Sequence, residues 1–254
     1  MSLMGSPFAA DSSRRRWLQG LARGFFLSAL SGLSACAVRR DRSGQKETRV
    51  APEYLAKTDI DRIFDNSREE IMISLFLLAE KLYRRNPREW RKAAASLEEA
   101  LGRLKRFRDA APQGIGEAKE SAAILLAFTP NYAFDRVAAF LYGLLSMVDA
   151  AYEHREEFFF LDSLEAQKLY NCARNVEIAA WKLAEMKNEA GESFLLSNAL
   201  SANARNLSFE REFGKIIALL DFVARVVEDR NGRAINRVAQ SLATAVFLPV
   251  GFLK

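Results

Sequence analysis

The sequence contains only two cysteines, Cys36 and Cys172, and a single histidine, His154. Zinc sites are built from several cysteine or histidine ligands. Di-iron helical bundles need two Glu-x-x-His motifs, and here the residue three positions before the only histidine is Ala151. We therefore expect no metal site and no cofactor. Cys172 lies in an apolar stripe of helical spacing, which predicts a packed, unreactive thiol.

Motifs of the common catalytic classes are also lacking. No Gly-x-Ser-x-Gly sequence is present, and His154 would have to serve as any imidazole base. The Gly114-Ile115-Gly116 sequence lacks the third glycine and the lysine-serine pair of phosphate-binding loops. We expect no catalytic residues, and the sequence favours a non-enzymatic protein.

The charge balance argues against a nucleic-acid-binding protein. Lysine and arginine total 37 against 32 acidic residues, a net charge of +5. The first 35 residues hold four of these arginines and one aspartate, which leaves 33 basic and 31 acidic residues in the remainder. Nucleic-acid binding needs a concentrated basic face, and this remainder is nearly balanced. We expect no nucleic-acid partner.

The most informative segment is the N-terminal one. Three consecutive arginines stand before an apolar run over residues 24–35, and the sequence Leu33-Ser34-Ala35 then precedes Cys36. About 12 apolar residues rise only ~18 Å as a helix, which is too short to span a bilayer. This order resembles a bacterial twin-arginine export signal that ends in a lipoprotein processing site. The matching signal residues are Arg14, Arg15, Trp17 and Leu18.

The resemblance implies a cellular location. Residues 1–35 would be removed as a signal peptide, and Cys36 would carry acyl chains that hold the protein on a membrane. The export and lipoprotein-processing machineries are then partners. Ala37, rather than aspartate, follows the cysteine, and in such lipoproteins this favours the outer membrane over the inner one, facing the periplasm. An organellar transit peptide is the alternative, because the segment is rich in arginine and serine and poor in acid.

The rest of the chain divides into two parts. Residues 36–58 are charged and polar without an apolar period, which predicts a flexible tether. Residues 59–254 repeat apolar side chains every three or four positions, with breaks between the repeats. This pattern predicts an all-α fold, a single-domain bundle of about seven helices. The expected helices span residues 59–85, 86–104, 117–127, 131–152, 162–188, 208–231 and 234–247, with 131–152 at the centre.

A polar cluster and an apolar C-terminal segment are candidates for binding. Asn171 and Asn175 stand one helical turn apart with Arg174 between them, in a partly apolar setting, and they form a candidate polar pocket. Helix caps and loop hydrogen bonds are the alternative explanation. The apolar residues 245–254 either dock on the protein's own core or form a patch for a partner.

Three functions fit these observations. The first is a non-enzymatic accessory or scaffold protein of the cell envelope with an envelope protein as partner, which predicts a filled core and an exposed apolar patch. The second is a helical binding protein for an apolar or amphipathic, lipid-like molecule, serving a transporter, which predicts a closed apolar cavity of about 300 Å³ or more. The third is an enzyme, which would show converging ionisable groups with shifted pKa values in a cleft.

Overall fold

The computed structural model describes residues 37–40, 46–49, 57–201, 204–205, 207–232, 235–237 and 245–251. The chain divides into two units, Met1–Ala56 and Lys57–Lys254. The predicted export-signal and lipidation residues lie outside the described residues; they are Arg14, Arg15, Trp17, Leu18 and Cys36.

The first unit contains a β-hairpin in the segment that the sequence predicts to be a tether. Strand β1 (Ala37–Arg40) pairs antiparallel with β2 (Lys46–Arg49). Val38 lies opposite Thr48, and both are β-branched residues that favour strands. The many charged residues of this segment led to the prediction of a tether, although these two residues favour strands.

The second unit is helical, as the sequence predicts. In the described part of the chain it holds seven helices and one short strand pair, so the all-α class is confirmed. The elements are α2 (Asp59–Arg85), α3 (Pro87–Trp90), α4 (Leu97–Lys105), α5 (Glu120–Leu126), α6 (Arg136–Ala151), α7 (Ala166–Glu185), β3 (Ala199–Ser201), β4 (Ala204–Arg205) and α8 (Ser208–Asn231).

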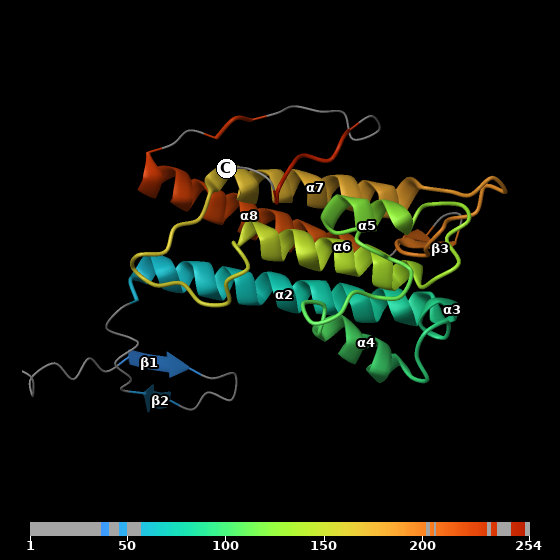
Figure 1. The fold of residues 1–254 in the computed structure, drawn as a ribbon, viewed down its shortest axis with the longest axis horizontal. Coiled ribbons are helices and arrows are strands. Elements are labelled where there is room, and N and C mark those ends of the chain that lie inside the picture. Colours follow the sequence, from blue (N-terminus) through green and yellow to red (C-terminus); the bar gives the residue numbers. More distant parts are fainter. Residues whose placement is uncertain are drawn as a thin grey trace, which may run out of the picture. The chain divides into compact units, whose positions relative to one another are not determined.

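The long helices lie side by side, as Figure 1 shows for α2, α6, α7 and α8. Helix α8 contacts α2 and α7, whereas α6 contacts α2, α5 and α7. Each long helix turns an apolar stripe inward, which is the usual source of stability in a helical bundle. None of the helices described combines the length and the apolar character needed to cross a membrane.

Helix α6 is the centre of the bundle, as predicted. All its residues except Arg136 and Ser146 are buried. It begins later than the sequence pattern suggests, because Asp135 caps it: the Asp135 carboxylate accepts a hydrogen bond from the Ala138 N–H at 2.9 Å. Such a cap satisfies a backbone donor that would otherwise lack a partner at the helix start.

A glycine in α6 sets how closely α5 approaches. A Cβ atom built on Gly143 would lie 2.5 Å from the Glu120 carbonyl oxygen and 2.7 Å from the Ile124 nitrogen. Both atoms belong to the backbone of α5, so α5 rests directly on the bare backbone of α6.

The structure corrects two of the predicted helices. The helix expected over residues 86–104 is two helices, because Ser96 starts α4 by accepting the Glu99 N–H at 3.1 Å. The helix expected over 234–247 is not present at residues 235–237 or 245–247, and residues 238–244 lie outside the described part. The backbone that follows residue 247 is bonded to α7, since the Leu248 N–H donates to Asn175 Oδ1 at 2.6 Å.

Candidate functional site

A pocket of about 670 Å³ lies beside the end of α2, between α4 and the start of α6. Tyr83 of α2, Leu104 of α4 and Ala138 of α6 line it, and residues 109–113 form one side. The break at Ser96 allows α3 and α4 each to contact α2, so the pocket is enclosed by short elements around one long helix. Its volume is typical of sites for small organic molecules, about 300–1,000 Å³.

An aromatic wall borders this pocket. Phe134 lines the pocket with 39% of its surface exposed, and its ring centroid lies 5.7 Å from that of Tyr132. Phe134 also packs on Gly114, where an added Cβ would lie only 2.1 Å from a ring carbon. Gly114 also has a φ of +83°, a conformation that side chains disfavour. The local backbone therefore fixes the position of the ring.

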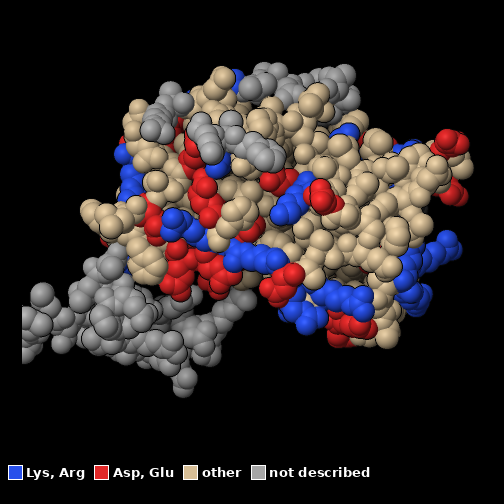
Figure 2. Space-filling view, in the orientation of Figure 1, with Lys and Arg blue, Asp and Glu red and all other residues tan. Residues whose placement is uncertain are grey.

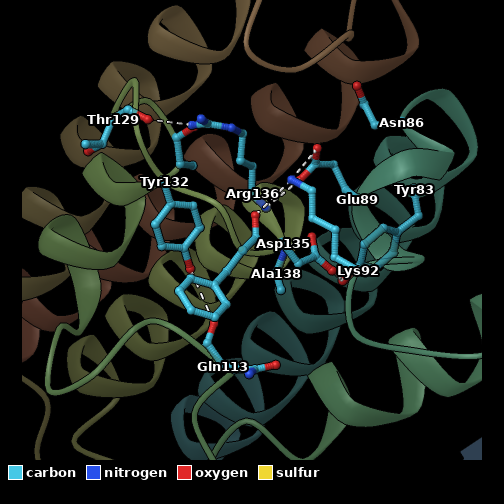
Figure 3. Close-up of polar contacts among 12 residues, drawn as sticks. Tyr83, Asn86, Glu89, Lys92, Gln113, Thr129, Tyr132, Asp135, Arg136 and Ala138 are labelled. Carbon is cyan, nitrogen blue, oxygen red and sulfur yellow. Dashed lines mark hydrogen bonds and ion pairs between the residues drawn. The ribbon is translucent and has the colours of Figure 1, made fainter.

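The polar centre of the pocket is Asp135, which is buried. Its carboxylate caps α6 and accepts a hydrogen bond from the Tyr83 hydroxyl at 2.9 Å; Figure 3 shows these residues. Burial raises the pKa of Asp135 to about 6, although the hydrogen bonds from Ala138 and Tyr83 act in the opposite direction. Burial and the nearby Asp135 charge also raise the pKa of Tyr83, so its hydroxyl stays protonated and acts as the donor.

Cationic side chains border the pocket. Lys92, Arg103 and Arg106 line it at exposed positions. Lys92 pairs with Glu89 at 2.8 Å, and both residues are labelled in Figure 3. Lys92 also donates to the Phe134 carbonyl at 3.0 Å. On the face drawn in Figure 2, acidic and basic side chains are interspersed.

Two charged residues hold the start of α6 in place next to the pocket. Glu89 accepts the Arg136 backbone N–H at 2.7 Å, which satisfies a second donor at the helix start. The Arg136 guanidinium donates to the Ala127 and Thr129 carbonyls at 2.7 and 2.8 Å, at the end of α5. These bonds tie α3, α5 and α6 together, so the pocket is preorganised by charge-assisted hydrogen bonds.

The raised pKa of Asp135 predicts a pH-dependent cost in stability. Its ordinary pKa is about 3.9, so the folded chain binds a proton more tightly than the unfolded chain, and stability falls as pH rises from about 4 to 6. Asp135→Asn removes this cost while keeping a good cap. The variant should match the wild type near pH 4 and be more stable by about 2–3 kcal/mol at pH 7. Urea titrations at both pH values check this, and an unchanged difference across that range would contradict it.

The sequence-predicted polar cluster lies elsewhere, on α7. Asn175 donates to the Leu248 carbonyl at 2.7 Å, and Asn171 donates to the Pro249 carbonyl at 2.7 Å. Arg174 pairs with Asp221 of α8 at 2.6 Å. The structure thus brings the two asparagines together but turns them to the chain's own backbone, whereas Arg174 joins two helices. None of the three lines the pocket beside Asp135.

The same bonds explain the apolar C-terminal segment. Val250 is 1% exposed, and residues 248 and 249 are held by the α7 asparagines. Gly251 N–H also bonds to the Glu120 carboxylate. Of the two alternatives for this segment, these contacts favour docking for residues 248–251.

The chain matches none of the family models, curated proteins or solved structures with which it was compared. The site is therefore interpreted from its own geometry. Within the described residues, no group of three or more His, Cys, Asp or Glu side chains is arranged to hold a metal ion. A second hollow of about 410 Å³ lies between α7 and α8 beside Trp181, and three glutamates line it.

Sequence reasoning did not identify Asp135 or Tyr83 as site residues. An aspartate before a helix is an ordinary cap, and Tyr83 ends an ordinary apolar stripe. The signal that was available is indirect: Asp135 interrupts the most apolar stretch of the domain, where a charged residue has to be paired or exposed.

Proposed function

We propose that this protein is a lipid-anchored, periplasm-facing binding protein of the bacterial envelope, which holds an amphipathic, lipid-like molecule in the pocket beside Asp135. One observation carries the proposal: apolar walls surround a buried carboxylate in a pocket of about 670 Å³. This favours a binding role over a scaffold role, which has no need of such a pocket. The pocket is partly open rather than closed, so a ligand has a route of access.

The lining specifies how such a ligand would be oriented. Its apolar part would contact Leu104, Phe134 and Ala138. A hydroxyl or amine of the ligand would donate to Asp135, because Tyr83 already supplies one donor and a carboxylate accepts several. An anionic group would lie near Arg106, because Arg103 of the lining is already paired with Glu99 at 2.7 Å.

The anchor rests on the resemblance of residues 13–36 to a lipoprotein export signal. Acyl chains on Cys36 would retain the protein on the membrane, with about 0.8 kcal/mol from each buried methylene. Ala37 favours the outer membrane, and an envelope protein or transporter would be the partner that exchanges the ligand. Intact-mass measurement of the protein made in bacteria tests the anchor. We expect the mass of a chain that starts at an acylated Cys36, and a chain that keeps residues 1–35 would refute it.

A fluorescent fatty acid, dansyl-labelled undecanoic acid, tests the pocket directly. Ala94→Trp places a bulky ring in the pocket from a half-buried position, and we expect it to weaken probe binding at least about tenfold. Ala184→Trp is the matched control, because Ala184 is also half-buried but lines the hollow between α7 and α8. Equal weakening by both variants, or by the control alone, would reject the pocket as the binding site. Native mass spectrometry of the purified protein would then identify any retained ligand.

A further inference from the structure

We propose that Phe160 and Leu161, which we call the apolar tip, insert into the bilayer on which the Cys36 anchor would hold the protein. The inference rests on the proposed lipid anchor and is independent of the pocket. It assigns one occupant, a phospholipid surface, to an exposed apolar feature.

The apolar tip is unusually exposed for side chains of its kind. Leu161 is 91% exposed and Phe160 is 63% exposed, and they are adjacent in the connection between α6 and α7. Loop tips in water-facing positions usually carry polar or small residues. Aromatic and aliphatic side chains that project together are typical of segments that enter the boundary between headgroups and acyl chains.

The backbone beneath the tip is firmly held. Phe158 is completely buried against Phe64 and Tyr152, with ring centroids at 5.7 and 6.0 Å. On the other side, Phe159 N–H donates to Asp162 at 3.0 Å, and Arg230 of α8 donates to the Phe160 carbonyl at 3.0 Å. The loop therefore cannot turn its apolar side chains inward without breaking contacts to α2 and α8.

The position of the tip points to the membrane as its occupant. The chain enters this unit at Lys57, 21 residues after Cys36, and the Lys57 ammonium lies 4.8 Å from the Phe159 ring centroid. Lys57 also pairs with Asp65 at 2.7 Å, while Asp65 accepts the Phe158 N–H at 2.8 Å. The end of the domain that is nearest in sequence to the anchor is thus the end that carries the apolar tip.

The charges around the tip are paired with one another. Lys57 pairs with Asp65 and Glu157, Arg155 pairs with Asp162, and Arg230 pairs with Asp61. These three cations stand against four carboxylates, so the surface offers no strong attraction to anionic lipid. The contact should therefore depend on apolar burial and change little with salt, unlike binding by exposed charges.

A position-specific dye tests the proposal in the full-length lipidated protein. Leu161→Cys is labelled with a polarity-sensitive nitrobenzoxadiazole dye; Cys172 is buried and Cys36 would be blocked by its lipid. Leu207→Cys is the matched control. Leu207 is 63% exposed but lies at the other end of α2, where Lys81 bonds to the Ser208 carbonyl. Both proteins are reconstituted on vesicles of phosphatidylethanolamine and phosphatidylglycerol, and flotation reports the anchor separately.

We expect the dye at position 161 to brighten several-fold on vesicles, to be quenched by doxyl-labelled lipid, and to respond equally at low and high salt. The dye at position 207 should stay in a watery environment. If the protein floats with the vesicles but the dye at position 161 does not change, insertion of the apolar tip is refuted while the lipid anchor is supported. Protein that does not float overturns both. If the dye at position 161 is shielded from water only in envelope extracts, the tip binds a protein partner and not the bilayer, which would also overturn the proposal.

Discussion

Asp149→Ala is expected to lower the free energy of unfolding by about 3–5 kcal/mol. Asp149 is 5% exposed, and its carboxylate accepts hydrogen bonds from the Arg108 guanidinium. The same carboxylate lies 2.7 Å from His154 Nδ1 and 3.5 Å from the Arg68 guanidinium. The variant leaves the largely buried Arg68 without its counter-charge, and an uncompensated buried charge is costly. Chemical denaturation at neutral pH measures the loss.

The same cluster predicts a response to acid. Burial acts to raise the pKa of Asp149, but hydrogen bonds from Arg108 and His154 outweigh it, and the pKa lies below its ordinary value. The ionised carboxylate therefore stabilises the fold above about pH 4, and this contribution is lost as pH falls through the lowered pKa. Asp149→Ala should lack that acid-dependent loss.

Glu80→Ala is the control for the substitution at Asp149. It breaks only the exposed pair with Arg84 and should change the free energy of unfolding by no more than about 0.5 kcal/mol. A similar loss of stability in both variants would show that burial of the ion pair is not the cause.

Gly143→Ala is expected to destabilise the domain by about 3 kcal/mol, which is unusual for a glycine-to-alanine change within a helix. The new methyl group would meet the Glu120 carbonyl oxygen at 2.5 Å, and that backbone atom cannot rotate away. Helix α5 would have to move off α6. Urea denaturation compares the variant with the wild type.

Gly214→Ala is the control for this substitution. Gly214 lies within α8 with no heavy atom within 4 Å of the added Cβ, so alanine should gain about 0.5–1 kcal/mol through its higher helix propensity. Opposite signs for the two variants are the expected result. A gain at both positions would mean that α5 and α6 are not in backbone contact.

Much of the fold follows from apolar spacing. The stripes through Ile71 and Leu75, and through Phe213 and Leu220, predict α2 and α8 with their boundaries because local signals agree with the period. The split between α3 and α4 was not predicted, because the apolar spacing continues across Ser96 and only the serine's hydrogen bond to Glu99 reveals the break.

The site was harder to predict than the fold. Tyr83 and Asp135 are 52 positions apart and meet only through the packing of α2 against α6, so no local pattern marks them. Asn171 and Asn175 were singled out as part of a candidate polar pocket, because amides in a partly apolar setting need partners. Their partners are backbone carbonyls of residues 248 and 249, and a backbone carbonyl has no sequence signature.

The length of α2 has a consequence for how a bound molecule would travel. Lys57, where the chain joins the domain, precedes one end of α2, and Tyr83 lies near the other, so the helix separates them by about 36 Å. If Phe160 and Leu161 insert into a bilayer as proposed, the pocket lies near the opposite end of α2 from the membrane surface. Under the proposed function, a lipid-like ligand would then leave the pocket on the side of the domain away from that membrane, and the length of α2 would set this distance.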